Sequence, residues 1–186
     1  MKNIILASKS PRRKELLELL DLNFTVEVPE VDEVFPESLD VTKVAEYLAN
    51  LKADAFTNIP TDTVVITADT VVILDEQILG KPKDKAEAVN MLKSLSNRCH
   101  KVITGVCIKS KDKTVSFSNT TKVFFKELTS SEIEHYIENY KPFDKAGSYG
   151  IQEWIGAIGI TKIEGSYFNV VGLPIHELNK QLANFE

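Results

Sequence analysis

Apolar and polar residues follow two kinds of pattern along this chain, one typical of strands and one typical of helices. β-branched or alternating runs predict strands over residues 3–7, 24–28, 63–68, 71–74, 101–108, 114–118, 120–125 and 157–163, with a hairpin turn in LDEQIL at 74–79. Apolar positions three and four residues apart predict helices that start at Ser10 and Pro11, over 40–56, after Asp84, after Thr129 and at Pro174. Strands and helices alternate early and strands cluster later, which predicts an α/β domain around one mixed β-sheet, spanning residues 1–186.

Length, composition and charge narrow the class of protein. The 186 residues suit one globular domain, and 43% hydrophobic residues suffice for a sizeable core. A net charge of -5 argues against broad binding to nucleic acid or to anionic membranes. No apolar run reaches the length of a membrane span, and the N-terminus lacks the pattern of a signal peptide. We therefore expect Cys99 and Cys107 to be reduced thiols in a cytoplasmic protein.

The first candidate site lies where a strand leads into a helix, in the stretch ASKSPRRK. A helix N-terminus offers unpaired backbone N–H groups and a positive dipole end, so it attracts anions. Arg12 and Arg13 in the first turn oppose that dipole, at a cost of about a few tenths of a kcal/mol, unless an anion joins them. Together with Ser8 and Ser10 they predict an anion site, and a solvated pair of arginines is the alternative.

Acidic residues and a lysine extend this picture. Asp69 lies between two apolar runs, so it is either at a strand end, where it holds a turn, or buried with a partner. Glu33, in the acidic stretch EVDEVFPE, is either part of a solvated loop or an oxygen ligand for Mg²⁺. Lys81 follows a glycine without the spacing of a phosphate-binding P-loop, and a surface lysine is the alternative. Cations that neutralise phosphates, with carboxylates that hold a metal or activate water, suggest hydrolysis of a small polyphosphate.

Seven ordered motifs resemble one protein family. In chain order, from Ile5 to Leu182, they are LASKSPRRKELL, LANLKA, ADTVV, LGKPKD, VITGV, FDKAGSYGIQ and GSYFNVVGLP. The set closely resembles the Maf family of nucleoside triphosphate pyrophosphatases, which release a nucleoside monophosphate and pyrophosphate. This resemblance implies a fold like that of inosine triphosphatases, a single elongated domain with a central cleft across a mixed sheet. It also implies a homodimer, a divalent metal cation (Mg²⁺ or Mn²⁺) and a nucleoside triphosphate as the substrate.

The resemblance also assigns roles to individual residues. Asp69 corresponds to the proton acceptor proposed for the family, and a purely metal-ligating role for Asp69 is the close rival. The positions around the triphosphate and the metal correspond to Ser8, Arg12, Arg13, Glu33, Lys52 and Lys81. Three positions sort the family by nucleobase, and the residues there, Arg12, Thr70 and Gln152, resemble the branch that hydrolyses dTTP and UTP. Glu153 departs from the family pattern, in which a glycine commonly follows the glutamine.

Two other functions stay open at this point. A sister branch of the family favours methylated guanine nucleotides, so a 7-methyl-GTP pyrophosphatase is one alternative. Maf proteins are linked to arrest of septum formation, so a nucleotide-binding regulator of cell division with little catalysis is the other. Catalysis requires Asp69, Lys81 and the arginine pair, whereas a protein that only binds nucleotides has no need of Asp69. We therefore expect an enzyme that hydrolyses dTTP and UTP.

Overall fold

The chain folds into two units, each built from strands and helices. The computed structural model describes residues 2–185. Unit 1 comprises the chain up to Thr70, residues Thr104–Asn119 and the chain from Gly172. Its elements are β1 (Asn3–Leu6), α1 (Pro11–Glu18), β2 (Phe24–Val26), the 3-10 turn η1 (Val41–Lys43), α2 (Val44–Asp54), the first part of β3 (Thr63–Leu74), the second part of β5 (Cys99–Lys109), the first part of β6 (Thr114–Phe125), α7 (Ile175–Leu182) and η3 (Ala183–Phe185).

Unit 2 comprises residues Val71–Ile103 and Thr120–Val171. It contains the remaining parts of β3, β5 and β6 together with β4 (Gln77–Leu79), α3 (Lys85–Leu95), α4 (Ser130–Tyr140), η2 (Ala146–Ser148), α5 (Trp154–Gly159), β7 (Ile160–Glu164) and α6 (Tyr167–Val171). Within residues 2–185, no helix has both the length and the apolar character that a membrane crossing requires.

Strands pair in both directions. In unit 1, β1 is parallel to β2 and to β3, so that Leu6 lies opposite both Val26 and Ile66. In unit 2, β4 is antiparallel to β3, and β7 is antiparallel to β6. Parallel and antiparallel pairs along the same strands confirm the predicted α/β class with a mixed sheet.

Five of the predicted strands differ clearly from the observed ones. The runs at 63–68 and 71–74 form one strand, β3, and the runs at 114–118 and 120–125 form one strand, β6. The strand expected from Ala157 begins only at Ile160, because Trp154–Gly159 form helix α5. Hydrogen bonds from the backbone N–H groups of Gly156 and Ala157 to the Glu153 carbonyl (2.9 and 3.2 Å) commit this segment to a helical turn.

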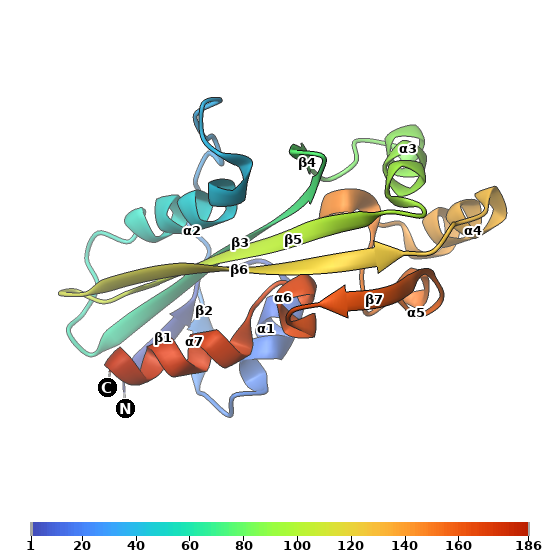
Figure 1. Ribbon diagram of the computed structural model, residues 1–186. Coiled ribbons are helices and arrows are strands. Elements are labelled where there is room, and N and C mark those ends of the chain that lie inside the picture. The colour runs from blue at the N-terminus through green and yellow to red at the C-terminus, as the bar shows by residue number, and fades with distance from the viewer. Residues whose placement is uncertain (1, 186) are drawn as a thin grey trace. The chain divides into compact units, whose positions relative to one another are not determined.

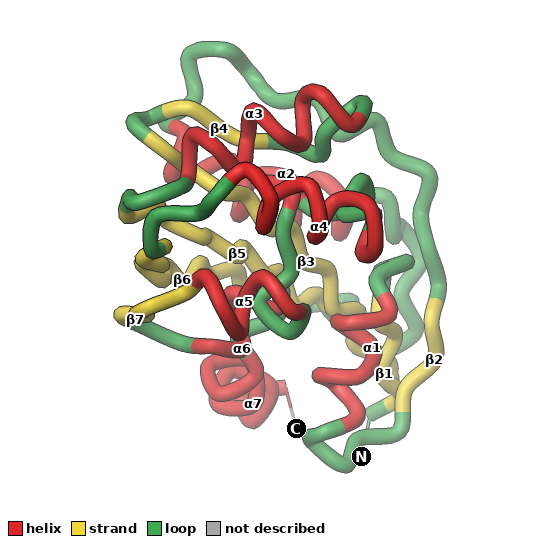
Figure 2. Tube along the Cα trace, turned by 90° about the vertical axis from the view of Figure 1, so that its right-hand side faces the viewer, coloured by secondary structure: helices red, strands yellow, loops and turns green. Residues whose placement is uncertain are grey.

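Helix α2 packs directly on the strands of unit 1. Its residues Ala49 and Ala53 are buried against Cys107 of β5, and Thr67 of β3 donates a hydrogen bond to the Ala49 carbonyl (2.6 Å). Gly105 of β5 permits this approach, because a Cβ there would lie 2.3 Å from a backbone nitrogen of α2. Figures 1 and 2 show α2 on one side of these strands and α1 and α7 on the other. The strands of unit 1 therefore carry helices on both faces.

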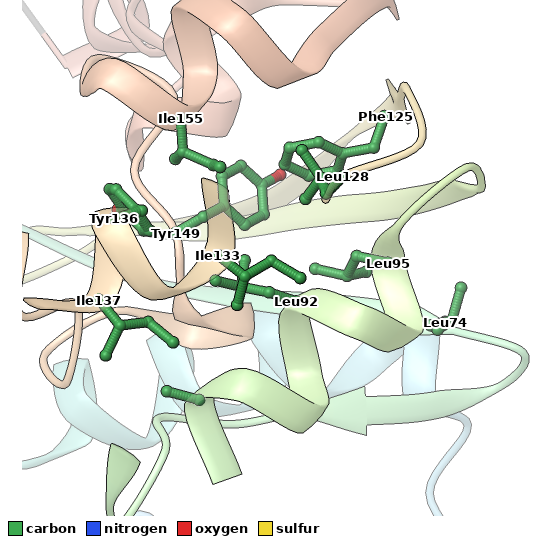
Figure 3. Close-up of a cluster of buried hydrophobic side chains, with 11 residues drawn as sticks. Leu74, Leu92, Leu95, Phe125, Leu128, Ile133, Tyr136, Ile137, Tyr149 and Ile155 are labelled. Atoms are coloured by element: carbon green, nitrogen blue, oxygen red, sulfur yellow. The ribbon is translucent and has the colours of Figure 1, made fainter. Parts of the chain in front are cut away.

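The core of unit 2 is a cluster of buried side chains from helices α3, α4 and α5 and the segments around them (Figure 3). The cluster consists of Leu74, Ala88, Leu92, Leu95, Phe125, Leu128, Ile133, Tyr136, Ile137, Tyr149 and Ile155. Phe125 and Tyr149 meet edge to face with their ring centroids 5.1 Å apart. Such edge-to-face contacts add to the stabilisation that apolar burial provides.

A buried histidine, His100, adjoins this core. Its ring stacks on Phe125, and its Nε2 atom lies 2.6 Å from the Tyr149 hydroxyl. Its Nδ1 atom has no hydrogen-bond partner among residues 2–185. Burial lowers the pKa of His100 from 6.5 to about 4, because the charged form would lose its hydration.

Substitution of Gly105 tests the close approach of α2. We expect Gly105→Ala to lower the free energy of unfolding by about 1–3 kcal/mol, because the added methyl group overpacks the contact with the α2 backbone. Urea titration measures this free energy. Gly80→Ala is the matched control, since a Cβ at Gly80 meets no atom within 4 Å. Equal destabilisation in the two variants would contradict this role of Gly105.

Acid stability tests the burial of His100. As pH falls from 6.5 towards 4, the unfolded chain takes up a proton at His100 and the folded protein does not. Stability that is present above pH 6.5 is therefore lost on acidification, with a slope that approaches about 1.4 kcal/mol per pH unit. We expect His100→Gln to lose less free energy of unfolding than the wild type between about pH 7 and pH 4.5, as followed by urea titration. His135 is exposed, so His135→Gln is the control and should lose as much free energy of unfolding as the wild type over this pH range. A wild-type slope in His100→Gln would refute the prediction.

Candidate active site

Two neighbouring residues inside β3, Asp69 and Thr70, face opposite sides of the strand. Asp69 is paired with Lys52 of α2, whereas Thr70 accepts a hydrogen bond from Arg13 of α1. This difference follows from the alternation of side chains along a strand. The Asp69 side chain is only 13% exposed. The expected pairing of a buried Asp69 is therefore confirmed, although the residue lies inside the strand and not at its end.

Lys52 joins two carboxylates. Its Nζ atom lies 2.6 Å from Asp69 Oδ1 and 3.0 Å from Glu33 Oε1. Lys52 belongs to the last turn of α2, where a cation also interacts favourably with the helix dipole. Glu33 comes from the loop between β2 and η1, and its side chain is 55% exposed. The fold thus brings together three residues that are far apart in the sequence and that the family resemblance assigns to the site.

The guanidinium group of Arg13 is enclosed by acceptors of the protein. Its hydrogen bonds run from Nε to the Gly172 carbonyl (2.9 Å), from Nη1 to the Ala68 carbonyl (2.9 Å) and Ser8 Oγ (3.4 Å), and from Nη2 to Thr70 Oγ1 (3.0 Å). Four of its five N–H groups therefore have partners. Burial lowers the pKa of Arg13 from its usual value, and the nearby Asp69 charge opposes that change. Arg13 consequently fixes α1 to β3 and to the segment that precedes α7.

The N-terminus of α1 has the features of an anion site. Ser10 is the N-cap and Pro11 opens the helix, as the sequence predicts, and the first turn contains no acidic residue. The buried Ser8 accepts a hydrogen bond from the Ser10 backbone N–H (3.2 Å). Arg12, half-buried, lies in the same first turn. Two arginines at the positive end of a helix dipole favour a bound anion.

Thr104 and Gly172 belong to this arrangement and were not singled out by sequence reasoning. The Thr104 hydroxyl, which is fully buried, lies 2.9 Å from the Thr70 hydroxyl. The Gly172 carbonyl accepts the Arg13 Nε–H bond, and Gly172 has a φ of +131°, a conformation that favours glycine. A threonine inside an apolar run signals that a buried hydroxyl needs a partner. That signal does not say which residue is the partner.

Glu33 and Asp69 also fit the role of metal ligands. Both carboxylates already share one cation, the Lys52 ammonium, so they face a common position. Among residues 2–185 no cluster of three or more histidine, cysteine or acidic residues could hold a metal. Mg²⁺ is often bound by one or two carboxylates together with phosphate oxygens of the substrate. The two carboxylates therefore suit a cation that arrives with a polyphosphate.

Two predicted site residues, Lys81 and Gln152, belong to unit 2. Lys81 is exposed in the loop between β4 and α3. Gln152 is exposed in the segment between η2 and α5. Their assignment to the substrate stays a prediction from the family resemblance.

Known proteins are similar to this chain over nearly its whole length. The Maf-like protein family model matches residues 3–185. A dTTP/UTP pyrophosphatase of Porphyromonas gingivalis is 52% identical over 186 residues, which cover 98% of this chain and 94% of that protein. A dTTP/UTP pyrophosphatase of Christiangramia forsetii is 53% identical over 180 residues, or 96% of this chain and 92% of that protein. Among solved structures, the Staphylococcus aureus Ham1 protein is similar over 67% of this chain and 72% of its own, with a TM-score of 0.49 and 18% identity. The family match and the identity of the two relatives together establish that this chain belongs to the Maf family.

Proposed function

We propose that this protein is a nucleoside triphosphate pyrophosphatase that hydrolyses dTTP and UTP to the nucleoside monophosphate and pyrophosphate. The observation that carries the proposal is the cluster of Asp69, Lys52 and Glu33 in the same unit as the basic N-terminus of α1. The full-length similarity to relatives named dTTP/UTP pyrophosphatases supports it. The proposed role is removal of non-standard or excess pyrimidine nucleotides.

In the proposed reaction, water attacks the α-phosphorus of the substrate. A new bond forms between the water oxygen and this phosphorus, and the bond to the bridging oxygen of the leaving pyrophosphate breaks. Asp69 orients the water and accepts its proton. Lys52 holds the Asp69 carboxylate at 2.6 Å, which fixes the direction in which it accepts. The competing hypothesis is that Asp69 only binds the metal and accepts no proton.

Cations of the protein offset the charge of the triphosphate in this proposal. Arg12 and Lys52 bind phosphate oxygens as cations, and Ser8 binds them through its hydroxyl. Lys81 of unit 2 is proposed for the same role because it lies in the LGKPKD motif, which resembles the family. Positive charges placed in advance stabilise the pyrophosphate as it gains charge in the transition state. Arg13 has one N–H group left for the substrate, so its main contribution is to hold Ser8 and Thr70 in place.

A divalent cation, Mg²⁺ or Mn²⁺, completes the proposed site. Glu33 and Asp69 are the residues that would hold it, together with phosphate oxygens. When bound, such an ion supplies positive charge to the phosphates and lowers the pKa of water near it. When no metal is bound, the positive charge of Lys52 offsets the negative charges of Glu33 and Asp69.

Base choice is proposed to depend on Gln152, Arg12 and Thr70. The amide of Gln152 can both donate and accept a hydrogen bond, which suits the mixed donor and acceptor edge of thymine or uracil. Thr70 faces Arg13 in the structure, so we assign it an indirect role through that arginine. A site built on hydrogen bonds rejects a wrong base because its own polar groups are left unpaired, at a cost of about 1–3 kcal/mol each.

The proposal also covers the oligomeric state, the cellular location and the binding partners of the protein. We propose a homodimer in the cytoplasm with a nucleotide as its ligand and without nucleic acid or membrane partners. The Maf family resemblance supports the dimer. The net charge of -5 and the two free thiols, Cys99 and Cys107, support the other assignments.

A panel of nucleotides tests the proposed function. With Mg²⁺ or Mn²⁺, we expect kcat/KM to be highest for dTTP and UTP, lower for CTP, and lowest for GTP and 7-methyl-GTP. The assay detects pyrophosphate and the nucleoside monophosphate. Release of inorganic phosphate with a nucleoside diphosphate would show that another bond is cleaved. A preference for 7-methyl-GTP would place the protein in the sister branch, and lack of turnover on every nucleotide would favour the regulator of cell division.

Substitution of Asp69 tests its role as the proton acceptor. Asp69→Asn keeps the shape of the side chain and removes its charge, so we expect kcat to fall by a factor of about 10² to 10⁴ while nucleotide binding persists. Asp54→Asn is the matched control, because Asp54 also pairs with a lysine of unit 1 (Lys109, 3.0 Å) but is exposed at 75%. Near-normal turnover of Asp69→Asn would remove the base assignment. Loss of metal-dependent nucleotide binding, measured by calorimetry, would assign Asp69 to the metal instead.

A further inference from the structure

Gln152 lies at the corner of a tight turn. The Glu153 backbone N–H donates a hydrogen bond to the Gly150 carbonyl (3.0 Å), which closes a four-residue turn with Ile151 and Gln152 at its centre. Gln152 itself is exposed. The position of its amide therefore depends on how firmly the two ends of the turn are held.

One tyrosine hydroxyl holds both ends of the turn. Tyr136 of α4 is fully buried, and its hydroxyl accepts a hydrogen bond from the Gly150 backbone N–H (3.0 Å). The same hydroxyl donates a short hydrogen bond to the Glu153 carboxylate. Burial and the Glu153 charge raise the pKa of Tyr136, so the hydroxyl keeps the proton that it donates.

A buried lysine neutralises the other oxygen of that carboxylate. Lys145 Nζ lies 3.0 Å from Glu153 Oε1 and 2.7 Å from Asp144 Oδ1, and Lys145 is only 9% exposed. The Glu153 side chain is 24% exposed, and loss of its charge would leave Asp144 as the remaining partner of the buried Lys145 ammonium. Glu153 is thus the residue that links Tyr136 and Lys145.

The backbone of the turn has little room to move. A Cβ at Gly156 would lie 2.0 Å from the Ile151 carbonyl oxygen, so the first turn of α5 rests on the turn itself. A Cβ at Gly150 would lie 2.9 Å from the Glu153 carboxyl carbon. Contacts from α4, from α5 and from the Glu153 side chain therefore surround this segment.

We propose that Glu153, together with Tyr136 and Lys145, is a positioning residue for Gln152 and thereby strengthens the preference of the enzyme for thymine and uracil. This inference rests on the proposed function, in which Gln152 binds the base. Glu153 itself does not contact the substrate. Its effect is to keep the Gln152 amide in one orientation, which is what discrimination by hydrogen bonds requires.

Four single-residue variants and one double variant test this inference. Glu153→Gln removes the charge that pairs with Lys145, and Tyr136→Phe removes the hydroxyl while it keeps the ring. Gln152→Ala removes the amide that is being positioned. Ile137→Val is the matched control, because it trims the buried neighbour of Tyr136 on α4 and leaves the polar contacts intact. The ratio of kcat/KM for dTTP to that for CTP is measured for each, since this ratio does not depend on the fraction of folded enzyme.

We expect this ratio to fall by about 5- to 20-fold in Glu153→Gln and in Tyr136→Phe, the size expected when one hydrogen bond to the base is weakened. Ile137→Val should leave the ratio unchanged. The double variant with Gln152→Ala and Glu153→Gln should show the same ratio as Gln152→Ala alone, because the two residues act through one interaction. Exchange of the Gly150 amide proton, followed by NMR, should be faster in Tyr136→Phe than in Ile137→Val.

The possible failures are distinguishable. If Gln152→Ala lowers the ratio and Glu153→Gln does not, the inference is overturned and the proposed function stands. If Glu153→Gln lowers the ratio further in the absence of the Gln152 amide, its effect does not run through Gln152, which also overturns the inference. If the wild type has no preference for dTTP over CTP, the proposed base choice fails and the inference fails with it. Unchanged exchange of the Gly150 amide in Tyr136→Phe would refute the positioning contact whatever the substrate is.

Discussion

The enclosure of the half-buried Arg13 guanidinium by hydrogen-bond acceptors is the constraint on which the rest of unit 1 depends. A charged group that is partly removed from water needs acceptors, and Arg13 finds four, in the segments around Ser8, Ala68, Thr70 and Gly172. The four acceptors lie 5, 55, 57 and 159 positions from Arg13 in the sequence, so their meeting fixes the start of α1 against β3 and the approach to α7. The same bonds hold Ser8 at the anion site and Thr70 inside the strand. A group that first suggests substrate binding therefore contributes largely by organising the residues around it.

Strand β3 divides the work of the site between its two faces. Asp69 faces α2, where Lys52 joins it to Glu33, and Thr70 is held by Arg13 of α1 and by Thr104 of β5. Lys52 of α2 reaches Asp69 because Gly105 lets the backbone of the helix lie directly on β5. In the proposed reaction the Asp69 face accepts the proton, whereas Thr70 on the other face bonds to Arg13, and a change of register by one residue would exchange the two faces.

Unit 2 uses a similar solution on a smaller scale. A single buried hydroxyl, that of Tyr136, joins the two ends of the turn that carries Gln152, and the Glu153–Lys145 pair completes the contact. In unit 1 the buried Ser8 side chain helps to hold the partly exposed Arg13. In unit 2 the buried Tyr136 hydroxyl holds the turn that carries the exposed Gln152. Buried polar groups are expensive unless all are paired, so such networks fix one conformation when they are complete.

The sequence by itself determined most of the local structure, α5 being an exception, and predicted the chemical class of the proposed site. Capping by Ser10, the apolar periods and the β-branched runs predict the elements, because these signals act over a few neighbouring residues. The sequence also indicated that a carboxylate among apolar residues needs a partner, which Asp69 has. Only the tertiary structure decided that this partner is Lys52, that β3 runs without a break through Asp69, and that Arg13 is held by Thr70 and Gly172. The physical reason is that a pairing between distant residues depends on which strands and helices pack together, and no local pattern of residues encodes that choice.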